Sequence, residues 1–168
     1  MVKETVEAEA KEYAQGAERP LKGYVLLMTA FSGLVGVAGV VAALVGTRSR
    51  RISPYDLVLV TVGTQKLARL LTKDAVTSPL RVPFARYKDT GGPSEVMEDV
   101  RRDGSVRHAV GELITCPFCL AVWVGTGLTL GLLFAPRLTR TIASALTAIS
   151  GADFLQLIYA HLQQVAEK

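Results

Sequence analysis

Residues Gly23 to Gly46 read GYVLLMTAFSGLVGVAGVVAALVG and contain no charged side chain. As an α-helix this stretch would be roughly 36 Å long, which exceeds the hydrocarbon thickness of a bilayer, about 30 Å. A secretory signal peptide has a shorter apolar core, about 7–15 residues, after a short basic segment. Here the preceding segment is long and acidic, with Glu4, Glu7, Glu9, Glu12 and Glu18. The stretch therefore predicts a transmembrane helix.

Two further apolar segments lie in the C-terminal half of the chain. Residues 117–135 again carry no charge and end before Pro136, so they are as convincing a span as the first. Residues 139–162 are less hydrophobic, because Asp153 lies among them and Ser, Thr and Gly interrupt the apolar pattern. Small residues suit close helix packing, so we expect this segment inside a bundle, with Asp153 turned inward or toward an interface.

A fourth helix is predicted over residues 54–72. Ser53 is a suitable N-cap and Pro54 suits a first helical turn. Lys66 and Arg69 shorten its charge-free stretch, so it either crosses beside other helices or lies partly in the headgroup layer. The sequence thus predicts an all-α fold, an integral membrane helical bundle with three to four membrane-associated helices at about 23–46, 54–72, 117–135 and 139–162.

We expect one membrane domain, residues 21–162, between a charged N-terminal tail or helix, 1–20, and a C-terminal tail, 163–168. Its largest polar segment is a basic loop, about 73–110, rich in Pro and Gly turn signals. Within it only SEVMEDVRR, residues 94–102, looks helical. If all four helices cross, twelve Lys or Arg lie on the side of the termini and this loop, and five on the other. The positive-inside rule then predicts cytoplasmic N- and C-termini.

Cys116 and Cys119, the only cysteines, form a CPFC motif where polar sequence turns apolar. Their spacing is that of thiol–disulfide exchange motifs, but the soluble βαβ context of those motifs is absent. Pro117 indicates that a helix starts at about this point. The simplest interpretation is two small apolar residues packed at a helix start, with Trp123 as an interfacial anchor.

A metal site is the alternative for the same cysteines. On one continuous helix His108, Glu112, Cys116 and Cys119 would share a face, being four, four and three residues apart. Zinc would suit such a set, although structural zinc sites close with four ligands and Pro117 interrupts the helix. Two CPFC motifs from two subunits could also supply four sulfurs.

Two groups of charged residues are candidates for other roles. A basic group could hold anionic lipid headgroups or a phosphate; its members are Lys66, Arg69, Lys73 and Arg81. Asp56 and Asp153 would be the ion or proton sites of a small transporter. The net charge of +4 is dispersed in loops rather than on an aromatic-bearing face, which gives no support to nucleic-acid binding.

Glycine spacing predicts helix contacts within the bundle or between subunits, so a homo-oligomer or a membrane protein partner is expected beside the lipid bilayer. The glycines concerned are Gly33, Gly36 and Gly39, and the GxxxG pair Gly127 and Gly131. No P-loop, GxSxG or HExxH motif occurs, so the sequence favours a protein without catalytic activity of its own.

Two motifs resemble the DUF1360 family of small bacterial membrane proteins, a family named without an assigned function. The first is TQKLARLLTKDAVTSPLRVPF, residues 64–84, and the second is GELITCPFCLAVWVG, residues 111–125. The residues that match are Lys66, Arg69, Asp74, Pro79, Arg81, Pro83 and Phe84 in the first, and Gly111, Glu112, Cys116, Pro117, Cys119 and Trp123 in the second. The resemblance covers about residues 56–134 and implies a multi-pass protein of a bacterial cytoplasmic membrane, with no reaction or cofactor.

The function expected from these observations is a structural or interaction role, in which the basic cytoplasmic loop contacts lipid headgroups or a protein partner. The first alternative is a metal-binding or thiol-redox membrane protein acting through the CPFC motif. A small transporter is the third.

Overall fold

The computed structural model describes residues 2–45 and 52–167. Its elements follow the order α1 Val2–Ala14, α2 Leu21–Leu44, α3 Pro54–Lys73, a 3-10 turn η1 Ser78–Leu80, β1 Ala85–Thr90, β2 Val96–Val100, α4 Ser105–Thr115, α5 Pro117–Phe134 and α6 Pro136–Ala166. Arg48, Arg50 and Arg51, which entered the charge count, lie outside the described residues.

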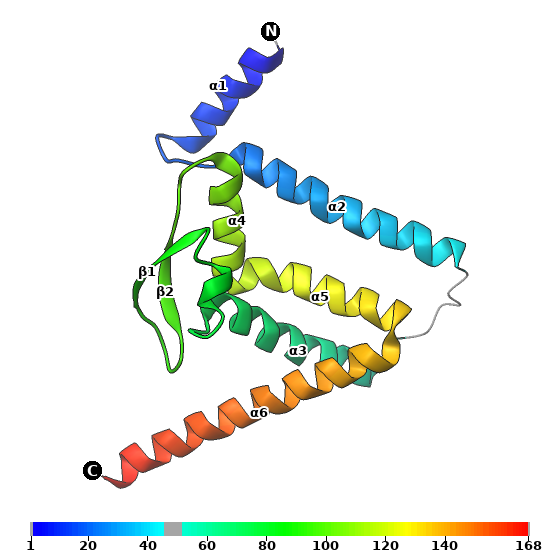
Figure 1. The fold of residues 1–168 in the computed structure, drawn as a ribbon, viewed down its shortest axis with the longest axis vertical. Helices are drawn as coiled ribbons and strands as arrows, with labels where there is room; N and C mark the ends of the chain where they lie inside the picture. The colour runs from blue at the N-terminus through cyan, green and yellow to red at the C-terminus, as the bar shows by residue number, and fades with distance from the viewer. Residues whose placement is uncertain (1, 46–51, 168) are drawn as a thin grey trace.

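The long helices form a bundle with a small polar layer at one end (Figure 1). α3 packs against both α5 and α6, while α2 is held mainly by α4. The hairpin β1–β2 and α4 lie at the end where α2 and α5 begin and α3 ends (Figure 1). The opposite end carries the start of α3 and the α5–α6 connection. All charges that come from the 73–110 segment are therefore at one end of the bundle.

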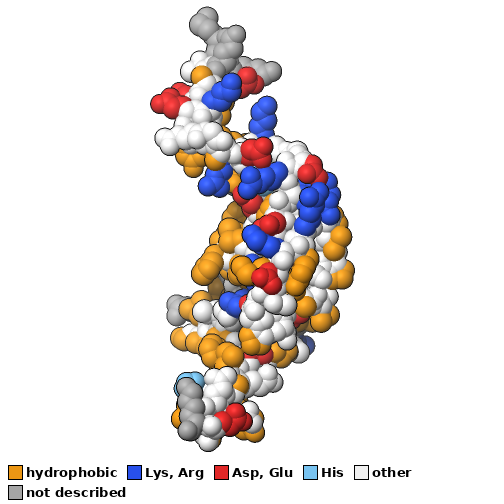
Figure 2. Space-filling view, turned by 90° about the vertical axis from the view of Figure 1, so that its left-hand side faces the viewer, with side chains coloured by type: hydrophobic (Ala, Val, Ile, Leu, Met, Phe, Trp, Pro, Cys, Tyr) orange, Lys and Arg blue, Asp and Glu red, His pale blue; other side chains and the backbone are white. Residues whose placement is uncertain are grey.

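Three helices are long and apolar enough to cross a membrane: α2, α5 and α6. Less than a fifth of the most apolar stretch of each is buried inside the protein, so their hydrophobic side chains face outward. α3 is less apolar and supplies the polar contacts of the bundle. Figure 2 shows the end of the molecule that carries the hairpin, where Lys, Arg, Asp and Glu side chains gather between hydrophobic flanks.

Helices α3 and α5 begin at Pro54 and Pro117, whereas α2 begins at Leu21 and α6 at Pro136, two and three residues before the expected positions. The Ser53 side chain accepts a hydrogen bond from the Asp56 backbone N–H at 3.1 Å, and the Asp56 carboxylate accepts one from the Ser53 N–H, which is a capping box. Pro117 separates α4 from α5, as its missing N–H requires. At the other end of the chain the expected tail from residue 163 is wrong, because α6 continues to Ala166.

The all-α prediction is wrong in one segment. Residues 85–100 form an antiparallel two-stranded hairpin, with a bulge between Tyr87 and Asp89. The helix expected over 94–102 is instead strand β2, in which Val96, Glu98 and Val100 are partly buried and Met97 and Asp99 are exposed. This alternation has the period of two that a strand requires, and the two valines are β-branched residues that favour strands.

Two glycines allow α4 to sit close to its neighbours. A Cβ on Gly23 of α2 would lie 2.3 Å from the Ser105 carbonyl oxygen, and a Cβ on Gly111 of α4 would lie 2.4 Å from a methyl group of Val100. The glycines of α2 expected to make helix contacts, Gly33, Gly36 and Gly39, meet nothing within 4 Å among the described residues. Close approach thus occurs where α4 meets α2 and β2, and also at the opposite end of the bundle, where a Cβ on Gly131 of the GxxxG pair would lie 2.6 Å from the Thr139 hydroxyl oxygen.

We predict that Gly111→Ala lowers stability, because the added methyl group would overlap Val100 and also lie 2.9 Å from the Phe84 carbonyl oxygen. Overpacking of this kind costs about 1–3 kcal/mol. Gly127→Ala in α5 is the matched control, since no neighbour in the part of the chain that the structure describes lies within 4 Å of its added carbon. Thermal unfolding of the detergent-solubilised chain measures both, and an equal or higher melting temperature for Gly111→Ala would contradict this packing.

Candidate functional site

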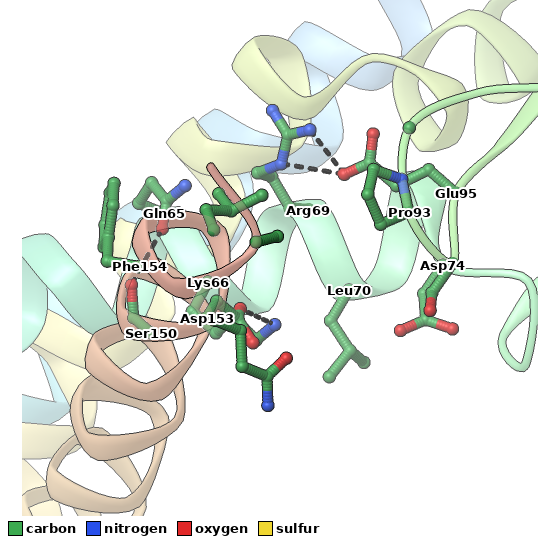
Figure 3. Close-up of a pocket in the computed structure, with 15 residues that line it drawn as sticks. Gln65, Lys66, Arg69, Leu70, Asp74, Pro93, Glu95, Ser150, Asp153 and Phe154 are labelled. Carbon is green, nitrogen blue, oxygen red and sulfur yellow. Dashed lines mark hydrogen bonds and ion pairs between the residues drawn. The ribbon is translucent and has the colours of Figure 1, made fainter. Parts of the chain in front are cut away.

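A groove of about 760 Å³ lies between α3, α6 and the turn of the hairpin (Figure 3). Two ion pairs cross it. The Lys66 ammonium is 2.5 Å from a carboxylate oxygen of Asp153 on α6, and Arg69 donates from Nε to Glu95 at 3.0 Å, with a second bond from Nη2. Beside them the Ser150 hydroxyl donates to the Gln65 side-chain oxygen at 3.4 Å. The groove is therefore lined by charges of both signs.

Glu95 lies in the turn of the hairpin, and its side chain lines this groove. Its backbone closes the turn through bonds between Gly91 and Glu95, at 2.8 Å, and between Glu95 and Gly92, at 2.9 Å. Asp74, the residue that caps α3, forms an isolated β-bridge with Glu95, and the Ala75 N–H donates to the Ser94 carbonyl at 3.0 Å. The end of α3 is thus attached to the hairpin turn, one turn of helix beyond Arg69.

Arg81 attaches the same end of α3 to the base of the hairpin. Its side chain is 1% exposed and its guanidinium donates five hydrogen bonds: two to the Glu98 carboxylate, at 2.6 and 3.3 Å, and three to the Leu71 carbonyl, the Asp74 carbonyl and the Thr77 hydroxyl, at 2.8 to 2.9 Å. A guanidinium has five N–H donors. Arg81 is therefore occupied by the fold and has no donor left for a headgroup.

The predicted basic group is divided by the structure. Lys66 and Arg69 lie together at the groove, Lys73 is half-buried at the end of α3, and Arg81 is buried on the hairpin side. Glu95, the acidic partner of Arg69, was not among the residues singled out from the sequence. It lies 26 residues from Arg69 in a segment expected to be helical, so local pattern gave no signal for the pair.

The CPFC motif occupies the start of α5. Cys116 is the N-cap, and its sulfur accepts a hydrogen bond from the Cys119 backbone N–H at 3.3 Å. Both thiols are free; Cys119 is exposed and Cys116 is partly buried. Cys119 borders an apolar cleft between α2 and α5 of about 300 Å³. Trp123, expected to be an interfacial anchor, packs edge-on against Phe31 across this cleft, with ring centres 5.1 Å apart.

His108 and Glu112 come together without the cysteines. The His108 Nε2 is 3.4 Å from a Glu112 carboxylate oxygen, and the same carboxylate accepts a short hydrogen bond from the Tyr24 hydroxyl and lies 4.0 Å from Arg19. Within residues 2–45 and 52–167 no three His, Cys, Asp or Glu side chains gather as a ligand set for a metal ion.

The two acids considered for ion transport are both in ion pairs. Asp56 is buried at the start of α3 and accepts two bonds from Arg140 of α6, at 2.7 and 2.9 Å. Asp153 is the partner of Lys66 at the groove. These contacts join α3 to α6 at two levels, so each carboxylate has a role in packing.

Comparison with known proteins finds relatives for more than half of the chain. The family model described as a protein of unknown function, DUF1360, matches residues 59–159. The chain belongs to the DUF1360 family. It is also similar to the sporulation protein YjcA of Bacillus subtilis, with 33% identity over 103 residues, which is 60% of this chain and 86% of YjcA. No solved structure matches the chain.

The DUF1360 match includes most of α3, the hairpin, α4, α5 and most of α6, and excludes α1 and α2. The two ion pairs of the groove, the Arg81 cluster and the CPFC motif all lie inside it. Tyr24 and Arg19, which contact Glu112, lie outside it.

We predict that Arg81→Met severely destabilises the chain, because Glu98, 7% exposed, would keep a buried charge without its partner. Removal of one member of a buried pair costs about 3–5 kcal/mol. Lys88→Met is the matched control, since Lys88 and Asp99 form an exposed pair at 3.1 Å on the same hairpin, and such pairs contribute about 0–1 kcal/mol. Similar melting temperatures for the two variants would contradict the role assigned to Arg81.

We also predict that the two thiols differ in reactivity. Cys119 is exposed, whereas Cys116 is partly buried, so a reagent in solution reaches the Cys119 sulfur more readily. A maleimide should therefore modify the Cys116→Ser variant, which keeps Cys119, faster than the Cys119→Ser variant. Mass spectrometry of timed samples measures both rates in the folded protein and, as a control, after denaturation. Equal rates in the folded protein would contradict this placement.

Proposed function

We propose that this chain is a small multi-pass protein of a bacterial cytoplasmic membrane with a structural or interaction role, in which the hairpin and α4 form the contact region on the cytoplasmic side. The observation that carries the proposal is the outward-facing apolar surface of α2, α5 and α6. Soluble monomeric proteins rarely expose contiguous apolar patches larger than a few hundred Å². In a bilayer the same side chains meet lipid and need no protein partner.

The placement of α3 supports the same arrangement. Its charged residues contact the neighbouring elements: Asp56 binds Arg140, Lys66 binds Asp153 and Arg69 binds Glu95. Charged side chains within membrane helices are costly unless they face the bundle interior and are paired. α3 therefore crosses as an inner helix, beside α5 and α6.

The hairpin and α4 offer the surface for interaction. Exposed basic side chains alternate with exposed acidic ones on this end of the molecule (Figure 2); they include Arg86, Lys88, Asp89, Asp99 and Arg102. The excess of Lys and Arg on this side supports a cytoplasmic orientation. Such a mixed polar surface, set next to lipid headgroups, suits a protein partner or the headgroups themselves. YjcA is named a sporulation protein, so we propose sporulation as the process in which to seek that partner.

The test is membrane extraction followed by labelling of single cysteines in a Cys116→Ser, Cys119→Ser background. Thr90→Cys places an exposed thiol on the hairpin, and Ala135→Cys places one at the opposite end of the bundle. We expect the chain to stay in the membrane pellet after alkaline carbonate treatment. The cells are first treated so that the reagent passes the cell envelope outside the cytoplasmic membrane. A maleimide that cannot cross the cytoplasmic membrane should then label Ala135→Cys in intact cells. It should label Thr90→Cys only after lysis.

The same experiment can contradict each part of the proposal. Release of the chain by carbonate would overturn membrane insertion. Labelling of Thr90→Cys but not Ala135→Cys in intact cells would reverse the orientation, and labelling of both would show that the two sites do not lie on opposite sides. Denatured samples of both variants provide the control that each thiol can react.

A further inference from the structure

The charges that line the α3–α6 groove do not suit a simple anion. Its lining contains two bases, Lys66 and Arg69, and three acids: Asp153 on α6, Glu95 in the hairpin turn and Asp74 at the end of α3. The formal charge of the lining is therefore −1. Each base already has an acidic partner, so a phosphate that bound here alone would leave carboxylates unpaired, which is unfavourable in a partly desolvated site.

The arrangement instead suits a ligand that carries both charges. Lys66 and Arg69 are three residues apart on α3, so their side chains leave the same side of the helix. Their acidic partners come from opposite walls, Asp153 from α6 and Glu95 from the hairpin (Figure 3). A bound anion could meet the two bases while a cation a few ångströms away meets the carboxylates. Arg69 is suitable, because its side chain is 48% exposed and, among the described residues, its bonds use only Nε and Nη2.

Apolar side chains continue the groove away from these charges. Phe154 and Leu157 of α6 and Leu70 of α3 belong to its lining, and Phe154 and Leu157 are more than half exposed. Gln65 and Gln156 add neutral hydrogen-bonding groups to the lining. A lining that combines charged, polar and apolar side chains suits an amphiphile better than a small ion.

We propose that the groove binds the headgroup of a zwitterionic phospholipid with a primary ammonium, that is, a phosphoethanolamine head. The phosphate is received by Lys66 and Arg69, the ammonium by Asp153 and Glu95, and the start of the acyl chains by Phe154 and Leu157. The inference rests on the proposed membrane function, because the ligand reaches the groove from the bilayer. It replaces the anionic lipid or phosphate expected from the basic group Lys66, Arg69, Lys73 and Arg81.

The chemistry of the groove distinguishes this headgroup from two others. Phosphatidylglycerol has the phosphate but no ammonium, so it would add a negative charge to a lining that already has an excess of one. Phosphatidylcholine has both charges, but its trimethylated nitrogen has no N–H to donate to Asp153 or Glu95. Both should bind more weakly than phosphatidylethanolamine.

Native mass spectrometry of the detergent-purified full chain tests the proposal. The protein is titrated with phosphatidylethanolamine, phosphatidylglycerol and phosphatidylcholine of identical acyl chains, and separately with soluble glycerophosphoethanolamine. We expect retention of phosphatidylethanolamine above the other two lipids. Competition by the soluble compound would show that the headgroup alone suffices, and its absence together with lipid retention would show that the acyl chains are also required.

Matched variants locate the binding. Arg69→Gln and Asp153→Asn should each weaken phosphatidylethanolamine binding about tenfold, because each removes one charge-assisted hydrogen bond. Lys88→Gln and Asp99→Asn make the same charge changes at the exposed hairpin pair and should leave binding unchanged. Leu157→Gln keeps both ion pairs and places a polar side chain where the acyl chains begin, so it should weaken binding even if the ion-pair variants fail to fold.

Equal or stronger retention of phosphatidylglycerol, or equal loss in the hairpin controls, would overturn the headgroup assignment. Absence of any lipid preference would overturn it as well, while carbonate-resistant membrane association in cells would leave the proposed membrane function standing. If the chain did not associate with the membrane, both the proposed membrane function and the proposed lipid site would be overturned.

Discussion

The Arg81 guanidinium connects the two parts of this protein, the helical bundle and the polar layer at its end. It binds carbonyl groups at the end of α3 and the carboxylate of Glu98 in β2, with both charges buried. Transfer of a charge pair out of water is favourable only when geometry is good and the remaining polar groups are satisfied. The five bonds of Arg81 meet that condition, so the hairpin has one position relative to α3.

The position of the hairpin then determines what the groove contains. Because the base of β2 is held by Arg81, the turn between β1 and β2 reaches the end of α3, where Asp74 and Ala75 pair with it. Glu95 arrives beside Arg69 as a result. The groove thus combines one acid supplied by a helix, Asp153, with one supplied by the hairpin, so its charge pattern depends on the polar layer being correctly attached.

The sequence predicts the helices of this fold better than its polar contacts. Long uncharged runs and the residues Ser53, Pro54, Pro117 and Pro136 act locally, so α2, α3, α5 and α6 begin and end within a few residues of the expected bounds, except where α6 runs on to Ala166. Strand β2 is five residues long and carries two charges, so its alternation is easily taken for a helix. Its pairing with β1 depends on register, which a single segment does not encode.

For the charged residues, spacing in the sequence predicts that Lys66 and Arg69 lie close together on α3. It does not predict which acidic side chains pair with them. Lys66 and Arg69 share a helix face by spacing alone, whereas Asp153 and Glu95 reach them from 87 and 26 residues away. A prediction from the bases alone therefore gave an anion site. When the acidic side chains are included, the formal charge of the groove lining changes from positive to negative. The class of ligand that fits the groove changes as a result.

Helix α2 contacts residues around the CPFC motif. α1 and α2 lie outside the DUF1360 match, yet Tyr24 at the start of α2 binds Glu112, and Phe31 packs on Trp123. α2 therefore covers side chains of the matched region and forms one wall of the cleft that Cys119 borders. Because Gly23 brings α2 within direct contact of α4, the same close approach that attaches the N-terminal part of the chain also holds one wall of the cleft beside Cys119. The surroundings of Cys119 thus depend on how α2 packs against α4 as well as on the motif itself.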